Sequence, residues 1–237
     1  MKRKFLFGWY QTPRGKLLQE VEASFIKRSI TVSCKQKILQ IGGLGWEEEF
    51  IDCDLYDVAI LDINGLGCPK AKKLRAKAYA LPIQSESIDL ILLPHLLEFD
   101  AHRFQTMREI ERVLKPEGHL VIINFNPWSF WVRYQYLWEI RLADSVLGHF
   151  ISKKRVLDWL RLLNFEAKAI SDLTIDKDKP RPVDVDGGFV SLFATSYAIR
   201  AIKRRYNLIP FTPVTVKKSG FAIAGNMESS QRSQDNV

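Results

Sequence analysis

The chain has 237 residues, of which 46% are hydrophobic, so it is long enough to bury one core of ordinary size. Lysine and arginine number 35 against 27 aspartate and glutamate, a formal net charge of +8, which leaves anionic partners open but also fits solvated lysines. The three cysteines form no Cys-x-x-Cys pair and have no histidine cluster nearby, which argues against a disulfide framework and a zinc site and favours a reducing cytoplasm.

The N-terminal sequence MKRKFLFGWYQTPRGK is basic but has too short an apolar run for a signal peptide. No run approaches the roughly 18 apolar residues of a membrane-spanning helix. We therefore expect a soluble, cytoplasmic protein with one domain over residues 1–205. Residues 206–237 form a C-terminal extension that we expect to be disordered from about residue 226.

The spacing of apolar residues predicts alternating helices and strands. In chain order, we expect a helix over 14–29, a strand over 37–41, a short helix over 47–51, strands over 58–61, 75–79 and 87–93, a helix over 104–114, a strand over 119–124, a helix over 152–164, a strand over 166–175 and a last, antiparallel strand over 197–202. This alternation predicts right-handed crossovers and a doubly wound, mostly parallel sheet.

The stretch KILQIGGLGWEEEFIDCDLYDVAILD is the most informative part of the chain. Its first apolar run stops at Gly42, Gly43 and Gly45, and its second run ends at Asp62. An α/β fold uses this order to place backbone N–H groups and a carboxylate around a nucleoside cofactor. The alternative for Asp62 is a helix cap or a solvated turn residue.

Aromatic residues concentrate after the strand over 119–124. The segment around Asn126, Trp128 and Trp131 is either a helix that buries its large side chains or a wall of an acceptor pocket. Trp9 has the same two interpretations, as a core residue or as part of a flap over a ligand. We retain Trp9, Asn126, Trp128 and Trp131 as candidate substrate-pocket residues.

Two segments, LPIQSESIDLILLPHLLEF and MREIERVLKPEGHLVI, resemble the middle of class I S-adenosylmethionine-dependent methyltransferases of the type 11 group. The resemblance covers roughly residues 14–205 and is most specific over 87–123. It implies a Rossmann-like α/β fold with a seven-stranded, mostly parallel sheet, the last strand antiparallel, and helices on both faces. It also implies that S-adenosylmethionine lies over the carboxyl ends of the first two strands.

The positions that match the family's cofactor site share a place at the carboxyl edge of the sheet. They are Gln40, Gly42, Gly43, Gly45, Asp62, Ala78, Leu81 and Pro94. In such a site glycines let the backbone approach the methionine and ribose, and a carboxylate at Asp62 accepts both ribose hydroxyls.

Three positions depart from the family's pattern. Gln40 stands where the family has an acidic residue, so it keeps an acceptor oxygen without the charge. Leu44 occupies the middle glycine position and either redirects the turn or blocks the pocket. Lys77 replaces an aspartate that accepts from the adenine amino group. Either the cofactor still binds, through backbone groups and Asp62, or the fold is kept and catalysis is lost.

Methyl transfer from a sulfonium needs little acid–base help, because the thioether is a good leaving group. If the acceptor carries a proton, His95 and Glu98 are the candidate bases, although each could instead cap a helix or hold a loop. The pattern suggests no metal site. We therefore expect methyl transfer from S-adenosylmethionine to a small-molecule acceptor.

The alternative function is a catalytically inactive, methyltransferase-like binding protein for nucleic acid or an anionic surface. It would use basic residues near the end of the domain and in the extension, namely Lys203, Arg204, Arg205, Lys217 and Lys218. Such clusters are also common as solvated ends of strands.

Overall fold

The computed structural model describes residues 4–30, 36–63, 67–130, 150–175, 182–183, 192 and 194–205. The expected extension over 206–237, Cys34 and the aromatic segment from Trp131 onward lie outside the described residues. The architecture below is therefore that of the chain up to Arg205.

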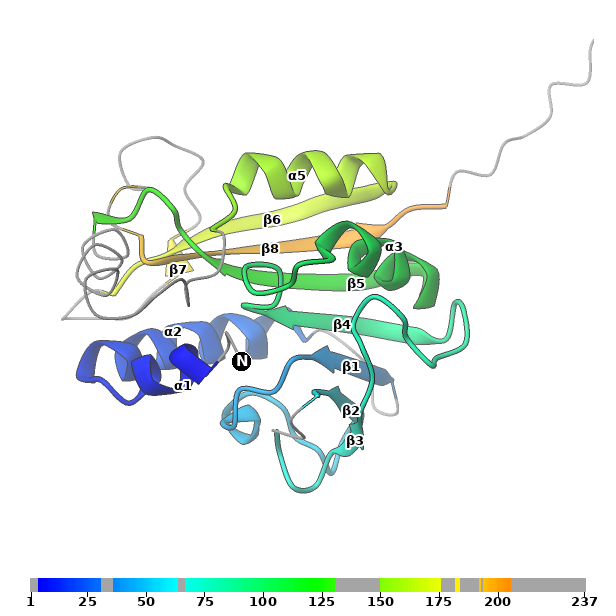
Figure 1. Ribbon diagram of the computed structural model, residues 1–237, viewed down its shortest axis with the longest axis horizontal. Coiled ribbons are helices and arrows are strands. Elements are labelled where there is room, and N and C mark those ends of the chain that lie inside the picture. The colour runs from blue at the N-terminus through cyan, green and yellow to red at the C-terminus, as the bar shows by residue number, and fades with distance from the viewer. Residues whose placement is uncertain are drawn as a thin grey trace, which may run out of the picture. The chain divides into compact units, whose positions relative to one another are not determined.

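One mixed sheet forms the centre of this part of the chain, with strand order β3-β2-β1-β4-β5-β8-β6-β7 (Figure 1). The strands are β1 (Lys37–Ile41), β2 (Asp57–Leu61), β3 (Lys72–Leu74), β4 (Ile88–Pro94), β5 (Leu114–Phe125), β6 (Phe165–Leu173), β7 (Pro182–Val183) and β8 (Ser196–Lys203). Strands β1 to β5 pair in parallel, and β8 runs antiparallel between β5 and β6. This order confirms the expected fold, to which the two-residue β7 adds an edge strand.

Helices cover both faces of the sheet, as expected. They are α1 (Lys4–Tyr10), α2 (Pro13–Ser29), the 3-10 helix η1 (Glu47–Glu49), α3 (Arg103–Val113) and α5 (Lys153–Leu162). Helix α2 contributes to one hydrophobic cluster, and α3 and α5 contribute to a second. In Figure 1, α1 and α2 lie on one side of β4 and β5, and α3 and α5 lie on the other.

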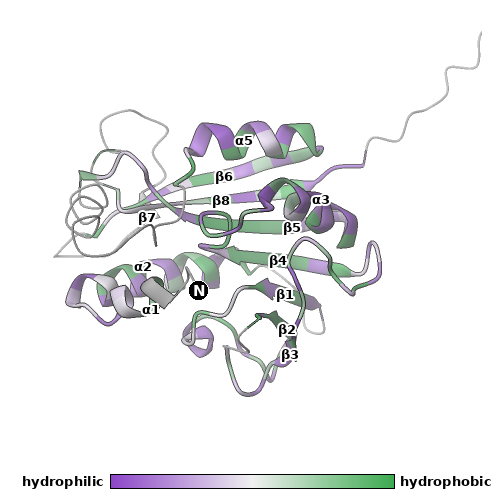
Figure 2. Ribbon diagram, in the orientation of Figure 1, coloured by the Kyte–Doolittle hydropathy of each residue, from purple (hydrophilic) through white to green (hydrophobic). Residues whose placement is uncertain are grey.

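Side chains along the central strands point alternately to the two faces of the sheet, which separates the two hydrophobic clusters. In β4, Leu90 and Leu92 join the cluster under α2, while Ile91 and Leu93 join the cluster under α3 and α5. Successive strand side chains point to opposite faces, so a strand buried on both faces needs a continuous apolar run. Figure 2 shows this apolar character along β4 and β5.

Three local predictions were wrong. The third strand is Lys72–Leu74 rather than 75–79, because its register with β2 ends at Leu61 paired with Leu74. The chain then leaves the sheet through a turn closed by a bridge between Lys77 and Ala80. The helix expected over 47–51 is a single 3-10 turn, and α1 was not expected at all.

Helices α1 and α2 pack closely at Gly15. The Thr12 side chain caps α2 by accepting from the Gly15 N–H at 3.0 Å and donates to the Trp9 carbonyl at 2.6 Å. A Cβ at Gly15 would lie 2.1 Å from the Trp9 carbonyl oxygen. The approach of the two helices therefore requires glycine at this position.

Substitution of Gly15 by alanine should destabilise the protein by about 1–3 kcal/mol, because the added methyl group meets backbone that cannot move aside. Gly8→Ala is the matched control, since nothing lies within 4 Å of a Cβ at Gly8 in α1, and it should stabilise by roughly 0.5–1 kcal/mol. Urea unfolding of both variants measures the difference. Equal stability of the two variants would contradict the tight contact.

Candidate functional site

A cavity of about 470 Å³ opens where β1 and β2 end and where the chain leaves β4. Its lining comes from four loops of the carboxyl edge, namely Ile41, Gly42, Leu61, Asp62, Ile63, Ala76, Lys77, Ala78, Tyr79, Leu96, Phe99, Asp100 and His102. Open α/β sheets bind ligands outside the carboxyl ends of their strands. The volume suits a small organic ligand.

The register of β1 and β2 brings Gly42 and Asp62 together. Ile41 pairs with Leu61, so the next residue of each strand reaches the same edge of the sheet. Gly42 has a φ of 95°, a backbone conformation that favours glycine. Asp62 is 7% exposed, and its Oδ2 accepts from the Gly43 N–H at 3.1 Å. A carboxylate in this lining can also accept hydroxyl groups from a ligand.

The other side of the glycine turn is held by Glu47. Its Oε1 accepts from the Leu44 N–H at 2.5 Å, and its Oε2 accepts from the Gly45 N–H at 3.1 Å. The Gln40 amide nitrogen donates to Glu47 Oε1 and to the Gly42 carbonyl, both at 2.9 Å. Gln40 and Glu47 are fully buried. The turn that lines the cavity is therefore fixed by two buried carboxylates, Asp62 and Glu47.

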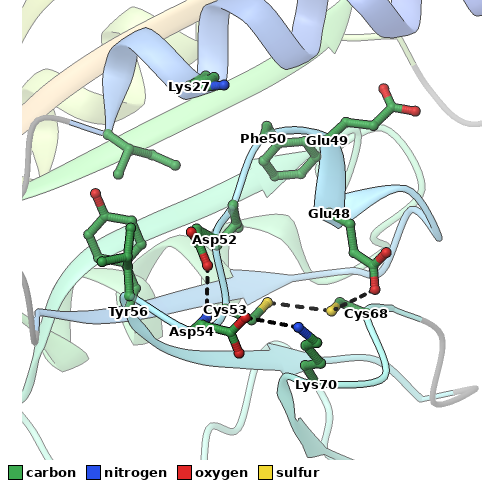
Figure 3. Close-up of a pocket in the computed structure, with 13 residues that line it drawn as sticks. Lys27, Glu48, Glu49, Phe50, Asp52, Cys53, Asp54, Tyr56, Cys68 and Lys70 are labelled. Carbon is green, nitrogen blue, oxygen red and sulfur yellow. Dashed lines mark hydrogen bonds and ion pairs between the residues drawn. The ribbon is translucent and has the colours of Figure 1, made fainter.

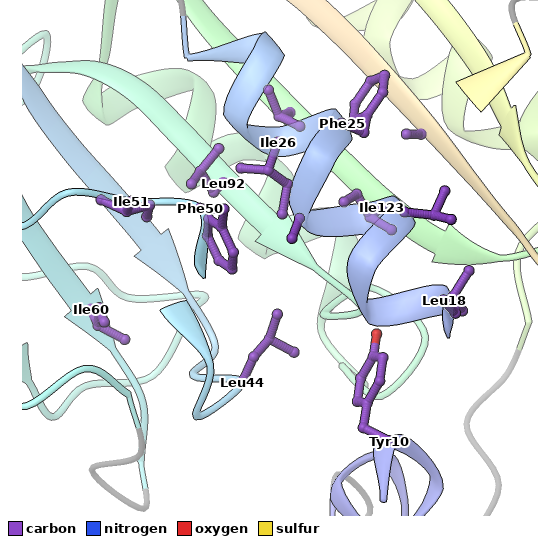
Figure 4. Close-up of a cluster of buried hydrophobic side chains, with 14 of the residues drawn as sticks. Tyr10, Leu18, Phe25, Ile26, Leu44, Phe50, Ile51, Ile60, Leu92 and Ile123 are labelled. Carbon is purple, nitrogen blue, oxygen red and sulfur yellow. The ribbon is translucent and has the colours of Figure 1, made fainter. Parts of the chain in front are cut away.

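Leu44 packs into the core and does not block the cavity. Its side chain is 2% exposed and belongs to the hydrophobic cluster under α2. Figure 4 shows it among buried side chains that include Phe50 and Tyr10. Leu44 is absent from the cavity lining, so the departure from glycine leaves that space open.

Lys77 and Ala78 line the cavity from the loop that follows β3. The Lys77 amine lies 5.5 Å from the centre of the Tyr79 ring, and a hydrogen bond with Tyr79 raises the lysine pKa. The His102 ring lies 4.5 Å from the same Tyr79 ring. Lys77 therefore pairs with an aromatic neighbour at the rim, beside the apolar surface that Ala78 contributes.

Five of the eight predicted cofactor residues lie outside the lining, namely Gln40, Gly43, Gly45, Leu81 and Pro94. The Leu81 backbone N–H donates to Glu109 Oε2 at 3.0 Å, which ties this loop to α3. Pro94 is the last residue of β4 and is buried. Both residues support the carboxyl edge without facing the cavity.

The candidate substrate-pocket residues are dispersed. Trp9 is buried and its ring packs edge-on against Phe125 at 5.4 Å. Asn126 closes a turn, accepting from the Trp128 N–H and donating to the Ala194 carbonyl, both at 3.1 Å. Trp128 is 59% exposed. None of these lines the cavity, and Trp131 lies outside the described residues.

His95 and Glu98 lie in a buried polar cluster with Glu22 of α2. His95 Nε2 is 3.1 Å from Glu22 Oε1, and His95 Nδ1 is 3.4 Å from Glu98 Oε2. Glu22 also accepts from Tyr10 at 2.5 Å and from Ser196 at 2.9 Å. The cluster joins α1, α2, β8 and the end of β4, and it does not line the cavity.

The geometry favours a charged His95. Both ring nitrogens face carboxylate oxygens, and only the imidazolium can donate from both. Burial opposes the charge, but Glu22 and then Glu98 outweigh it and raise the pKa of His95 to about 9. His95 also has a φ of 47°, so its backbone conformation is held by the surrounding contacts.

Glu22 and Glu47 were both missed by the sequence prediction. Glu22 interrupts the apolar face of α2 formed by Leu18, Phe25 and Ile26, and a charge on a buried helix face is a usable signal. Glu47 is one of three consecutive glutamates, and their pattern does not distinguish the buried one from the exposed ones.

A second cavity, of about 490 Å³, lies by the residues that precede β2 (Figure 3). Cys53 and Cys68 approach there with their sulfur atoms 3.4 Å apart, and both are free thiols. Burial, followed by the neighbouring Cys68, raises the pKa of Cys53 to about 12. Because this cavity borders the amino end of β2, its position does not fit the ligand site of an α/β sheet.

Residues 43–122 match a family model described as a methyltransferase domain. The chain is 31% identical over 159 residues to the uncharacterized protein YafS of Escherichia coli, covering 67% of this chain and 64% of that protein. It is 30% identical over 132 residues to an uncharacterized protein of Methanocaldococcus jannaschii, covering 52% of this chain and 63% of that protein. The chain therefore spans slightly less than two thirds of these relatives.

Solved methyltransferases have the same fold. An S-adenosylmethionine-dependent methyltransferase of Thermotoga maritima matches with a TM-score of 0.63 and 18% identity, covering 83% of this chain and 93% of that one. One of Archaeoglobus fulgidus matches with a TM-score of 0.58 and 19% identity, covering 78% and 94%. Together with the family model, these matches confirm the resemblance to class I, type 11 methyltransferases, here with an altered glycine turn.

The buried histidine should make stability depend on pH. Because the folded pKa of His95 is raised to about 9, its contribution is fully present below pH 6.5 and is lost as the pH rises through 9. The loss should amount to about 3 kcal/mol. Urea unfolding at pH 6 and pH 10 should therefore show a larger drop for the native protein than for His95→Gln.

His102→Gln is the matched histidine control, because His102 is exposed at the rim of the cavity. It should keep the pH dependence of the native protein. The same drop in His95→Gln as in the native protein would show that the cluster does not hold an imidazolium.

Proposed function

We propose that this chain, which has the class I methyltransferase fold, transfers a methyl group from S-adenosylmethionine to a small-molecule acceptor. The observation that carries the proposal is the position of Asp62. Asp62 lines a cavity at the carboxyl edge of the sheet, beside Gly42, whose φ is 95°. The proposed unit is residues 1–205, and its proposed location is the cytoplasm.

The residues of the cavity fit an adenosine group. Ile63, Ala78, Leu96 and Phe99 give apolar surface for a flat base, and the exposed fraction of Ile63 is 70%. The Asp62 carboxylate provides an acceptor for ribose hydroxyls. A buried acceptor, Gln40 Oε1, has no hydrogen-bond partner among the described residues, but Gln40 does not line the cavity.

S-adenosylmethionine, when bound, supplies an electrophilic methyl group on a sulfonium and leaves as a neutral thioether. The protein then has to orient two molecules and exclude water from the reacting atoms. Asp62 and the glycine turn orient the donor in this proposal. The apolar wall formed by Leu96 and Phe99 removes water from the side nearest β4.

His95 and Glu98 act as positioning residues in the proposal. They are fully buried, and Glu98 Oε1 accepts from the backbone N–H of Phe125, so the pair joins the ends of β4 and β5. That edge is where an acceptor would meet the methyl group. We propose Trp9 and Asn126 as support for the same edge, with Trp128 toward the acceptor.

Two of the basic residues named for the alternative, anion-binding function form ion pairs within the fold. Lys203 is 7% exposed and forms an ion pair with Glu111 at 2.9 Å. Arg204 pairs with Glu117 and with Glu166, the latter at 2.7 Å. These two cations are neutralised within the fold and are poorly placed to recruit phosphates. In the described part of the chain, no helix has the length and apolar character needed to span a membrane.

Calorimetric titration with S-adenosylhomocysteine tests the proposal. The native protein should bind, and Asp62→Asn should bind about tenfold to a hundredfold more weakly, because it loses charge-assisted hydrogen bonds worth about 1.5–3 kcal/mol. Asparagine keeps an acceptor for the Gly43 N–H, so the turn should stay folded.

Asp54→Asn is the matched control, because Asp54 forms an exposed ion pair with Lys70 by the second cavity. Its affinity should equal that of the native protein. Absence of binding heat from the native protein at millimolar ligand would contradict the proposed function, and equal weakening in both variants would remove the role of Asp62.

A further inference from the structure

Two thiols meet beside the second cavity, away from the proposed cofactor site. Cys53 lies in the turn that precedes β2, and Cys68 lies in the segment that leads to β3. Their sulfur atoms are 3.4 Å apart (Figure 3), and both residues line the cavity of about 490 Å³. The two sulfurs are therefore in contact without a bond, next to space that a small molecule can enter.

The packing of the two segments brings the thiols together. Gly67 has a φ of 129°, which favours glycine, and a Cβ there would lie 2.8 Å from the Cδ1 atom of Ile60 in β2. The next residue, Cys68, is thereby held against β2 in the hydrophobic cluster under α2. Beside the sulfur contact, Lys70 forms an ion pair with Asp54 at 2.8 Å. The segments thus contact each other at two neighbouring places.

The hydrogen bonds give the two thiols different roles. Cys53 donates to the Cys68 sulfur at 3.4 Å, and Cys68 donates to Glu48 Oε1 at 3.5 Å. Burial, followed by the hydrogen bond with Cys68, raises the pKa of Cys53 to about 12, so Cys53 stays protonated. It can then stabilise negative charge on the Cys68 sulfur, while Glu48 is placed to receive the Cys68 proton. Cys68 is therefore the nucleophile of the pair.

The cavity limits the size of a reagent that can reach this nucleophile. Cys68 is 3% exposed, whereas Cys53 is partly exposed. A peroxide is small enough to approach a sulfur with so little accessible surface. Thiols that are oxidised reversibly in reducing compartments have a second thiol within reach, which converts the first product into a disulfide. Cys53 is in that position.

We propose that Cys53 and Cys68 form a redox-modification site, which a peroxide oxidises to a disulfide and a dithiol reduces again. The Cys68 sulfur attacks one oxygen of hydrogen peroxide and breaks the O–O bond. The leaving hydroxide takes the Cys68 proton through Glu48 and departs as water, which leaves a sulfenic acid on Cys68. The Cys53 sulfur then attacks the sulfenic sulfur, and the second hydroxide leaves with the Cys53 proton. Two thiols and one peroxide thus give one disulfide and two waters.

The disulfide closes a loop around β2. Asp62 lies between the two cysteines in the chain, so the bond ties the segment before β2 to the segment that follows Asp62. A cross-link that closes a loop of this length restricts the unfolded chain and commonly stabilises the folded one. Oxidation therefore stabilises the part of the chain that carries Asp62. This inference does not depend on the binding of S-adenosylmethionine.

Peptide mapping of the full chain after treatment with hydrogen peroxide tests the inference. A peptide with Cys53 should be joined to a peptide with Cys68, and the intact mass should fall by two hydrogen atoms. The melting temperature should rise by about 5–10 °C, and dithiothreitol should reverse both changes. Cys34→Ser is the matched control, because it removes the third cysteine and keeps the pair. It should form the same bond with the same shift.

Dimedone, which reacts with sulfenic acids, tests the roles of the two thiols. Cys53→Ser removes the resolving thiol, so peroxide and dimedone together should label Cys68. In Cys68→Ser, labelling of Cys53 should be at least about tenfold lower, because its raised pKa keeps it protonated. Equal labelling in the two variants, or stronger labelling of Cys53, would contradict the assignment of Cys68 as the nucleophile.

The native chain decides the inference even where a serine variant does not fold. Thiols that only pack against each other predict no bond, so absence of a Cys53–Cys68 disulfide after peroxide treatment would overturn the proposal. A disulfide that includes Cys34 instead would also overturn it. An unchanged or lower melting temperature of the oxidised protein would contradict the stabilised loop.

Discussion

The cavity depends on a glycine turn that is fixed by carboxylates on two sides. Asp62 lines the cavity, and its carboxylate accepts a hydrogen bond from the Gly43 N–H. The Glu47 carboxylate accepts from the N–H groups of Leu44 and Gly45. A turn whose N–H groups are bound in this way is already ordered before a ligand arrives, which lowers the entropic cost of binding. The turn therefore has a well-defined conformation although Leu44 occupies its middle glycine position.

A second buried cluster fixes the neighbouring edge of the sheet. Glu22, His95 and Glu98 connect the N-terminal helices to the ends of β4 and β5. Two carboxylates around one imidazolium leave the group with a net negative charge, so the hydrogen bonds from Tyr10 and Ser196 are needed to stabilise it. The N-terminal helices thus become part of the carboxyl edge of the sheet.

The apolar runs and the glycine turn are local patterns, so the sequence was sufficient for the alternation of helices and strands and for the position of Asp62 directly after β2. It was not sufficient for Glu47 or Glu22, whose partners lie on other elements and whose burial only the fold creates. The third strand was misplaced for a similar reason: a three-residue edge strand with two lysines carries little apolar signal, and its pairing with β2 sets its limits. Leu44 showed that a departure from a motif can be absorbed by the core.

We propose that the cavity beside Gly42 holds the adenosine part of S-adenosylmethionine. A crystal structure of the protein with S-adenosylhomocysteine tests it most directly. We expect the base to lie against Ala78 and Leu96, with the ribose hydroxyls within hydrogen-bond distance of the Asp62 carboxylate. The proposal would be contradicted by a ligand bound in the cavity beside Cys53. It would also be contradicted by an empty cavity beside Gly42 in a crystal grown with saturating S-adenosylhomocysteine.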